Sequence, residues 1–458
     1  MKNFIPLFQF SNSKLPLKRV LKERIPIKQK ELKEVKEKFG DKFVAQYQVN
    51  QVIRGMRGIP ALFYDQSTVD SKQGVLFRGH TVSQVTKLLP KRTEDQSINL
   101  LKQQPLPEGI FFLLLTGVIP TFEQVEQVRQ EWDARGGLSN ELQRFINSLD
   151  KDLHPLTMLS MVIMYEQRES KFASLYGQQK LNKSNYWEYV YEDSVDLIAK
   201  LPRIAATIYR RKYNKEIILQ NQGMGLDWTE QLTYMMGNQN NEVLNECLRA
   251  YLTVHADHEG GEVSTHGSYV VGSALGDPYL SLSTACNGIQ GPLHGLASEE
   301  ALKWILQFIK LHGYDSTETQ IQQYVDQHIT EGRLIPGFGH SVLRVVDPRF
   351  NHFYEFSQKH LKEDKMVKLL HKLTDVIPQQ LGKYKQIKNP FPNVDAHTGT
   401  LLYQLGIKEY EFYTVLFAIS RSLGILTNLV WCRAYGLPIE RPESCDMTYF
   451  KKLFEQKQ

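Results

Sequence analysis

The sequence has few cysteines and lacks the short motifs of metal, redox and nucleotide sites. Its four cysteines (Cys247, Cys286, Cys432 and Cys445) are scattered over 458 residues with no CxxC pair. We therefore expect reduced thiols rather than a disulfide framework or a zinc knuckle. GxGxxG, P-loop and HExxH motifs are also missing, so the sequence gives no fingerprint of a dinucleotide fold, a nucleotide triphosphate site or a zincin.

Acidic residues are nearly missing from the N-terminus. Residues 1–30 hold eight Lys or Arg and one acid, Glu23, which gives them a net charge of +7. Because the whole chain has a net charge of +5, the other 428 residues carry a net charge of −2. A nearly neutral body does not indicate a general nucleic-acid surface. The first 22 residues mix basic, apolar and serine residues without a continuous apolar core. This composition is typical of an organellar transit peptide, and a basic, frayed tail is the alternative.

Strand-like alternation is scarce. QYQVNQVIRG (46–55) and GVLFRG (74–79) are its best candidates, whereas helical periodicity dominates the chain. ALKWILQFIKLHG (301–313) places apolar residues on one face and ends in glycine. EWDARGGLSNELQRFINSL (131–149) predicts a helix, a Gly-Gly turn and a second helix with Ser139 as its N-cap. We therefore predict an all-α fold.

One apolar segment, residues 411–436, is long enough to suggest a membrane span. Arg421 divides it into uncharged runs of nine and eleven residues, and a span needs roughly 18–20 apolar residues. We expect no membrane span and instead a helix buried in a protein core. A guanidinium in such a helix must be paired or must face a polar cavity. Its partner is either an internal Asp or Glu or the carboxylate of a substrate.

Histidines and acids gather in VHADHEGGEVSTHGS (254–268). A metal site is the first idea, but Gly260 and Gly261 would break the helix that sets the spacing of helical metal ligands. Two interpretations remain open. The segment is either a plain polar junction between a helix and a turn, or a junction that faces a substrate.

Three further loops place single reactive residues in stiff surroundings. His294 lies in a Gly/Pro-rich bend before an amphipathic helix, where the positive helix end keeps an imidazole neutral. His340 ends a Pro-Gly-Phe-Gly loop, and Asp395 follows two prolines in NPFPNVDAHTG (389–399). Each could be an ordinary cap or turn. Together with nearby arginines they would suit proton transfer beside a carbonyl, on a polyanionic substrate.

Several long motifs carry a resemblance to a known family. They are HADHEGGEVSTH, GSALGDPYLSLSTACNGIQGPLHGLA, RLIPGFGHSVLRVVDPR, NPFPNVDAHTG, YTVLFAISRSLG and ERP (440–442). With these motifs the chain resembles the citrate synthases of eukaryotic mitochondria from about residue 38 to its end. The resemblance implies condensation of acetyl-CoA with oxaloacetate and water to give citrate and CoA. It implies no cofactor and no metal.

The resemblance also implies an architecture and a location. The expected fold is an almost wholly α-helical homodimer with two domains in each subunit. Residues 36–295 and 407–458 would form the large domain, and residues 296–406 an inserted small domain that closes over the substrates. Residues 1–35 would be a mitochondrial targeting segment or an N-terminal tail. The expected location is the mitochondrial matrix.

The family's functional residues fall on positions of this chain. The implied catalytic residues are Asp395, which would take a proton from the acetyl methyl group, His294, which would stabilise the enolate, and His340, which would polarise the oxaloacetate carbonyl. The residues implied to bind oxaloacetate are His258, Arg349, Arg421 and, from the other subunit, Arg441. The residues implied to bind CoA are Arg57, Leu334, Ile335, Gly337, Phe338, Arg344, Lys388 and, from the other subunit, Lys183.

Two positions depart from the family pattern. Glu262 stands where the family usually has Asn, so it should weaken oxaloacetate binding unless it is protonated or turned away. Lys183 stands where the family has an arginine, which keeps the charge but loses the bidentate fork. The alternatives to a citrate synthase are a 2-methylcitrate synthase that uses propionyl-CoA, and a structural or filament-forming homologue with reduced activity.

Overall fold

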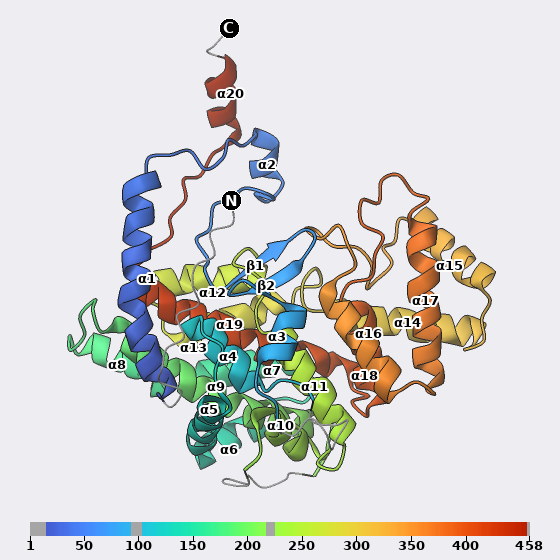
Figure 1. Cartoon of the computed structure of the whole chain (residues 1–458), viewed down its shortest axis with the longest axis horizontal. Coiled ribbons are helices and arrows are strands. Elements are labelled where there is room, and N and C mark those ends of the chain that lie inside the picture. Colours follow the sequence, from blue (N-terminus) through green and yellow to red (C-terminus); the bar gives the residue numbers. More distant parts are fainter. Residues whose placement is uncertain (1–14, 93–102, 217–224, 456–458) are drawn as a thin grey trace.

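The computed structural model describes residues 15–92, 103–216 and 225–455, and these form an all-helical protein with one small sheet (Figure 1). The predicted all-α fold is confirmed. The sheet contains β1 (Ser67–Asp70), β2 (Gly74–Phe77) and β3 (His80–Thr81), paired antiparallel in that order. β2 confirms the predicted strand at 74–79.

Two long helices, α9 (Tyr186–Lys212) and α19 (Tyr413–Tyr435), pack against each other in the core. α19 is buried along nearly its whole length, which is the pattern of a helix enclosed by other elements. With the preceding turn it is long and apolar enough to cross a membrane, but 94% of its most apolar window is buried inside the protein. The predicted burial of this segment is confirmed.

Further helices surround this pair. They are α4 (Pro107–Thr116), α5 (Phe122–Arg135), α6 (Asn140–Ser148), α7 (Pro155–Glu166), α8 (Lys171–Gly177), α10 (Trp228–Met236), α11 (Glu242–Val254), α12 (Val263–Ser273) and α13 (Pro278–Ile289). The 3-10 turn η1 (Gln167–Glu169) joins α7 to α8, a second 3-10 turn η2 (Tyr410–Phe412) precedes α19, and the short α3 (Val82–Leu88) lies between β3 and α4. Ser139 accepts a hydrogen bond from the Leu142 amide at 3.1 Å, so its predicted role as an N-cap is confirmed.

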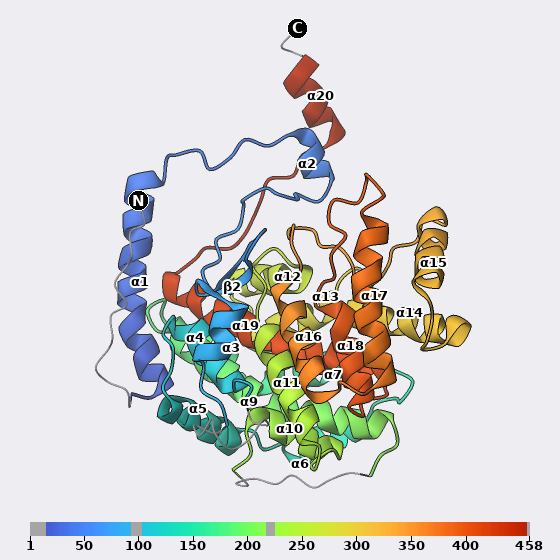
Figure 2. The ribbon, with the colours of Figure 1, turned by 45° about the vertical axis from the view of Figure 1, so that its right-hand side comes forward.

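A second group of helices lies together on one side of the molecule in both views (Figures 1 and 2). It consists of α14 (Ala297–His312), α15 (Glu318–Thr330), α16 (Pro348–His360), α17 (Lys365–Leu381) and α18 (Asp395–Gln404). α14 ends at Gly313 in a positive-φ conformation, which confirms the predicted stop.

The two ends of the chain behave differently. α1 (Leu17–Phe39) lies along the body and buries Leu17, Leu21 and Ile25, although residues 17–35 fall within the predicted targeting segment. By contrast, α2 (Val49–Ile53) and α20 (Met447–Glu455) project away from the body side by side (Figures 1 and 2).

The strand predicted at 46–55 is wrong, because α2 occupies its centre. The Gln48 amide at its N-terminus donates to the Gln51 side chain at 3.0 Å, and the Gln51 amide donates to the Gln48 carbonyl at 2.9 Å. Among the described residues, the strands that form a sheet are β1, β2 and β3, and none of them pairs with this segment. The cysteine prediction is confirmed for the described residues: all four thiols are free, and only Cys445 is exposed.

Candidate active site

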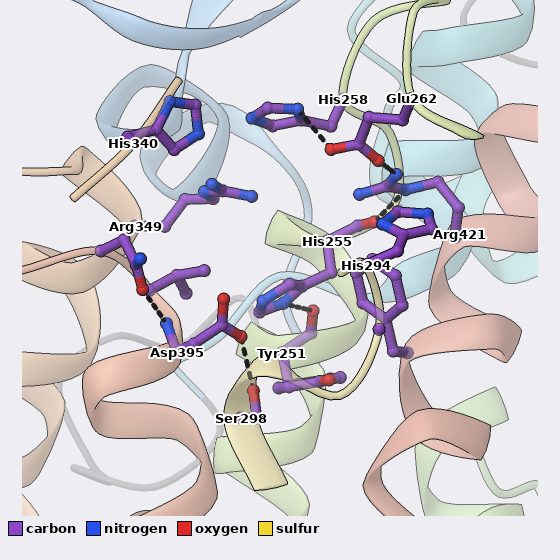
Figure 3. Close-up of a pocket in the computed structure, with 14 residues that line it drawn as sticks. Tyr251, His255, His258, Glu262, His294, Ser298, His340, Arg349, Asp395 and Arg421 are labelled. Carbon is purple, nitrogen blue, oxygen red and sulfur yellow. Dashed lines mark hydrogen bonds and ion pairs between the residues drawn. The ribbon is translucent and has the colours of Figure 1, made fainter. Parts of the chain in front are cut away.

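One pocket collects side chains from five separate parts of the chain (Figure 3). They come from the end of α11 and the loop after it, the turn before α14, the loop that ends in α16, the start of α18, and the middle of α19. Six of the predicted site residues line it: His258, His294, His340, Arg349, Asp395 and Arg421. The pocket therefore lies where the second group of helices meets the rest of the protein.

Asp395 is the first residue of α18, and its side chain does not cap that helix. Its backbone amide donates to Asn393 Oδ1 at 3.0 Å, and its Oδ1 accepts a hydrogen bond from the Ser298 hydroxyl at 2.5 Å. Burial raises the pKa of Asp395, while Ser298 and Arg349 act in the opposite direction. The loop thus holds a carboxylate of increased basicity at the pocket wall.

His294 lies in the turn before α14, as the sequence predicted. Its Nε2 lies 2.7 Å from the Ser264 hydroxyl of α12. Burial lowers the pKa of His294, and the nearby Glu262 partly opposes this. The predicted neutral imidazole therefore arises mainly from removal of water rather than from the helix end.

His340 has a defined tautomer. Its Nδ1 accepts hydrogen bonds from the backbone amides of Val342 and Leu343, both at 3.1 Å. Burial, together with His258 and Arg349, lowers its pKa to about 4. Because a neutral ring that accepts at Nδ1 carries its proton on Nε2, the second nitrogen of His340 is a hydrogen-bond donor.

Arg421 is paired inside the protein, as one of the two sequence interpretations expected. Its Nη1 donates to the Glu262 carboxylate, and its Nε donates to the His255 carbonyl at 3.0 Å. The other oxygen of Glu262 lies 2.8 Å from His258 Nδ1. Burial opposes ionisation, but Arg421 and His258 hold the pKa of Glu262 well below its usual range. Glu262 is therefore neither protonated nor turned away.

Arg349, at the start of α16, is buried beside Asp347. Its Nη2 lies 2.8 Å from Asp347 Oδ2, and its Nε lies 3.1 Å from Oδ1. Despite burial, this guanidinium lowers the pKa of Asp347 to about 2. Both pocket arginines are thus held by carboxylates of their own chain.

The remaining predicted residues lie outside the pocket lining. Arg441 is exposed in the segment between α19 and α20. Arg57, Arg344 and Lys388 are exposed. Lys183 is exposed between α8 and α9, and α8 lies across the molecule from α14–α18 (Figure 1).

The loop predicted to hold the adenine approaches the start of α18. Leu334 is exposed and Ile335 is buried, while Phe338 forms an isolated bridge with Pro392. The Asn393 amide donates to the Gly337 carbonyl at 2.9 Å. This loop is therefore joined to the stretch that carries Asp395.

Several residues of the pocket lining were not predicted as site residues. They are Tyr251, Gly295, Ser298, Asn393, Val394 and Phe417, whereas His255 belongs to the segment 254–268, for which a junction that faces a substrate was one interpretation. Helical spacing was an available signal for one of them, because Phe417 lies four residues before Arg421 on α19 and its ring centre is 4.8 Å from the guanidinium. Ser298 gave no local signal, since its contact with Asp395 spans 97 positions.

Within the described ranges, no group of three His, Cys, Asp or Glu side chains is arranged to hold a metal ion. What the pocket offers instead is a buried carboxylate, imidazoles with lowered pKa values and two arginines. Such a set can move protons beside a carbonyl and can bind carboxylates.

Comparison with known proteins shows the family of this chain. The family model described as "Citrate synthase, C-terminal domain" matches residues 55–443, which is well over half of the chain. The chain belongs to the citrate synthase family. The resemblance inferred from the sequence motifs is confirmed.

Curated relatives agree over nearly the full length. The mitochondrial citrate synthase of Tetrahymena thermophila is 53% identical over 448 residues, covering 98% of this chain and 96% of the relative. That of Kajikia audax is 44% identical over 434 residues, covering 95% and 91%. The crystal structure of the Pyrobaculum aerophilum citrate synthase aligns with a TM-score of 0.72 at 26% identity, covering 86% of this chain and 92% of that one.

A more distant structure shows the shared fold alone. It is the ternary complex of the Thermoplasma acidophilum citrate synthase with carboxymethyl coenzyme A and oxaloacetate, with a TM-score of 0.70 at 20% identity, covering 85% of this chain and 94% of that one. Together, the family match and the relatives establish the activity. The chain is an acyltransferase of the tricarboxylic acid cycle that condenses acetyl-CoA with oxaloacetate to citrate. The names of the relatives support a mitochondrial location.

Proposed function

We propose that the pocket of Figure 3 is the centre at which this citrate synthase carries out the condensation, with Asp395, His294 and His340 as its catalytic residues. The observation that carries the proposal is their convergence from three separate segments on one cavity, where a carboxylate of raised pKa meets two imidazoles of lowered pKa.

Asp395 is the base that removes a proton from the methyl group of acetyl-CoA. A thioester methyl is a very weak acid, so a carboxylate of raised pKa is better suited to the task than an ordinary one. His294 donates a hydrogen bond to the thioester oxygen as the enolate forms. In this assignment Ser264 donates to its Nε2, which leaves the proton on Nδ1 for the substrate.

His340 acts on the second substrate. Its Nε2–H donates to the oxaloacetate carbonyl while the enolate carbon attacks that carbonyl, and the developing alkoxide is stabilised by the same bond. The Val342 and Leu343 amides keep the tautomer fixed throughout. Hydrolysis of the resulting citryl thioester by water then releases citrate and CoA.

The oxaloacetate carboxylates bind Arg349 and Arg421, with His258 as a further hydrogen-bond partner. Both guanidiniums are buried in the pocket wall, where a bidentate pair with a carboxylate is strongest. CoA binds along the 334–338 loop, with Arg57, Arg344 and Lys388 near its phosphates. Support comes from the contacts of that loop with Pro392 and Asn393, which bring the acetyl end of the ligand toward Asp395.

The enzyme acts as a homodimer in the mitochondrial matrix, with Arg441 and Lys183 contributed across subunits. Arg441 is exposed in the arm between α19 and α20, and α20 projects away from the body (Figure 2). The start of the arm is fixed, because Glu440 contacts His266 at 2.8 Å and its amide donates to Ser273 at 3.0 Å. A partner that receives this arm would complete the oxaloacetate site.

Residues 296–406 form the small domain, and residues 36–295 and 407–458 the large one. α14–α18 lie together on one side of the molecule (Figure 1). The pocket lies between the two groups. Rotation of one group toward the other would close the pocket around both substrates.

The test is release of free CoA from acetyl-CoA, followed with a thiol reagent, with propionyl-CoA in parallel. We expect release that requires oxaloacetate and prefers acetyl-CoA. Asp395→Asn should bind oxaloacetate normally and lose about 10²–10⁴-fold in turnover. Near-normal turnover of this variant would exclude Asp395 as the base.

A further inference from the structure

Glu262 forms an ion pair with Arg421, one of the two arginines that face the pocket. Its carboxylate bridges Arg421 on α19 and His258 on the preceding loop (Figure 3), and its side chain is 24% exposed. No step of the condensation uses this acid. The position therefore needs an explanation of its own.

The charge balance of the pocket depends on Glu262. The charged residues of the lining are Arg349 and Arg421 against Glu262 and Asp395. With Glu262 ionised and in place, Arg421 is paired with Glu262 and Arg349 with Asp347, so neither guanidinium is free for a dianionic ligand. With Glu262 moved out, one positive charge is freed at the point where a substrate carboxylate can form a bidentate pair.

Arg421 does not depend on Glu262 for its position. Its Nε is held by the His255 carbonyl, and its guanidinium lies over the Phe417 ring at 4.8 Å. These contacts leave the Nη atoms for a carboxylate partner. Exchange of one carboxylate for another can therefore take place without moving the arginine.

Glu262 has an alternative position close by. It immediately precedes α12, and its side chain makes no capping hydrogen bond there. The first-turn amides of a helix attract anions, because they lack intrahelical acceptors and lie at the positive end of the helix dipole. A carboxylate released from Arg421 would remain ionised next to these amides.

Building on the proposed role of Arg421, we propose that Glu262 is an intramolecular competitor of oxaloacetate: a substrate carboxylate displaces it from Arg421, and this exchange sets the affinity of the enzyme for oxaloacetate. The ion pair must break each time substrate binds. The affinity is consequently lower than the two arginines alone would give. The exchange acts on the binding of oxaloacetate, because the contacts of Glu262 are with Arg421 and His258.

The experiment compares four variants of the full-length protein with the wild type by calorimetric titration with oxaloacetate. Glu262→Gln keeps the size of the side chain and removes its charge. Glu259→Gln is the matched control, because it removes the same charge from the same loop outside the pocket lining. Arg421→Ala and the double variant E262Q/R421A test whether the effect passes through Arg421.

We expect Glu262→Gln to bind oxaloacetate about tenfold more tightly or better. Glu259→Gln should bind as the wild type does. In the Arg421→Ala background, E262Q should give no further gain. Should Glu262→Gln fold poorly, Glu262→Asn is shorter and also neutral, and the same gain is expected.

Two unfavourable results can be told apart. If Arg421→Ala leaves oxaloacetate binding unchanged, the proposed function of that residue fails. If Arg421→Ala weakens binding but a folded Glu262→Gln or Glu262→Asn variant binds oxaloacetate no better than the wild type, the competition is overturned and Glu262 is a structural ion pair.

Discussion

The Ser298 hydroxyl donates to Asp395 Oδ1 at 2.5 Å and thereby joins the first turn of α14 to the first residue of α18. The same hydroxyl lies 2.9 Å from Thr398 Oγ1. One serine thus connects two helices and limits the directions in which the proposed base can point. It also lowers the pKa of that base against the effect of burial.

Ser298→Ala should change both the rate and its pH dependence. Asp395 acts as a carboxylate, and loss of the hydrogen bond would raise its pKa further. The acid limb of kcat/KM should therefore move to higher pH, and kcat at its plateau should fall by about 10- to 100-fold because the base is held less firmly. Ser268→Ala is the control, since that hydroxyl donates only to the Thr265 carbonyl. An unmoved acid limb would leave Ser298 with a purely structural role.

Arg441 permits a test of the proposed dimer by complementation. Arg441→Ala and Asp395→Asn should each be nearly inactive alone. A mixed dimer holds one site with an intact Asp395 and an intact Arg441 from the neighbour. After unfolding and refolding an equal mixture, about a quarter of the sites should be active. If mixing restores nothing while sedimentation shows dimers, Arg441 serves its own subunit or none.

Gly337 should tolerate no side chain. Its φ is +82°, and a Cβ there would lie 2.7 Å from Ala396 Cα, the residue after the proposed base. We expect Gly337→Ala to lose about 1–3 kcal/mol of stability through overpacking and to use acetyl-CoA poorly. Gly332→Ala is matched to it, with a φ of +72° and no atom within 4 Å. If the melting temperature falls and the KM for acetyl-CoA rises equally in both variants, the effect is backbone strain rather than the contact with Ala396.

The sequence predicted the parts of the fold that depend on local pattern. Periodicity and capping indicated α6 and α14, and the charge at Arg421 showed that α19 needs a polar partner. Motifs also pointed to the six residues that line the pocket. The strand predicted at 46–55 was wrong, because alternating Gln and Val fit an exposed, capped helix as well as a strand.

What the sequence could not predict are contacts between distant segments. The residues around Ser298 do not predict its hydrogen bond to Asp395. Likewise, the residues around Glu262 do not predict its ion pair with Arg421, which lies 159 positions away. The motif pattern marked Glu262 as unusual but left its direction open. Only the packing of α12 against α19 resolves it.

The contacts of α1 with the body limit where a removable targeting segment can end. Leu17, Leu21 and Ile25 are buried, Lys18 pairs with Glu192 at 2.7 Å, and Gln29 donates to a backbone carbonyl of α19 at 2.6 Å. A segment removed on import should leave these contacts intact, because burial of each large apolar side chain contributes about 1.5–3 kcal/mol.

Two truncations measure this. A chain that begins at residue 15 should keep the melting temperature and activity of the full-length protein. A chain that begins at residue 36 loses most of α1, so its melting temperature should fall by about 10 °C or more. Equal melting temperatures for the two would show that α1 adds no stability, and would return the boundary of the targeting segment to residue 35. A drop confined to the longer truncation would instead place that boundary before Leu17.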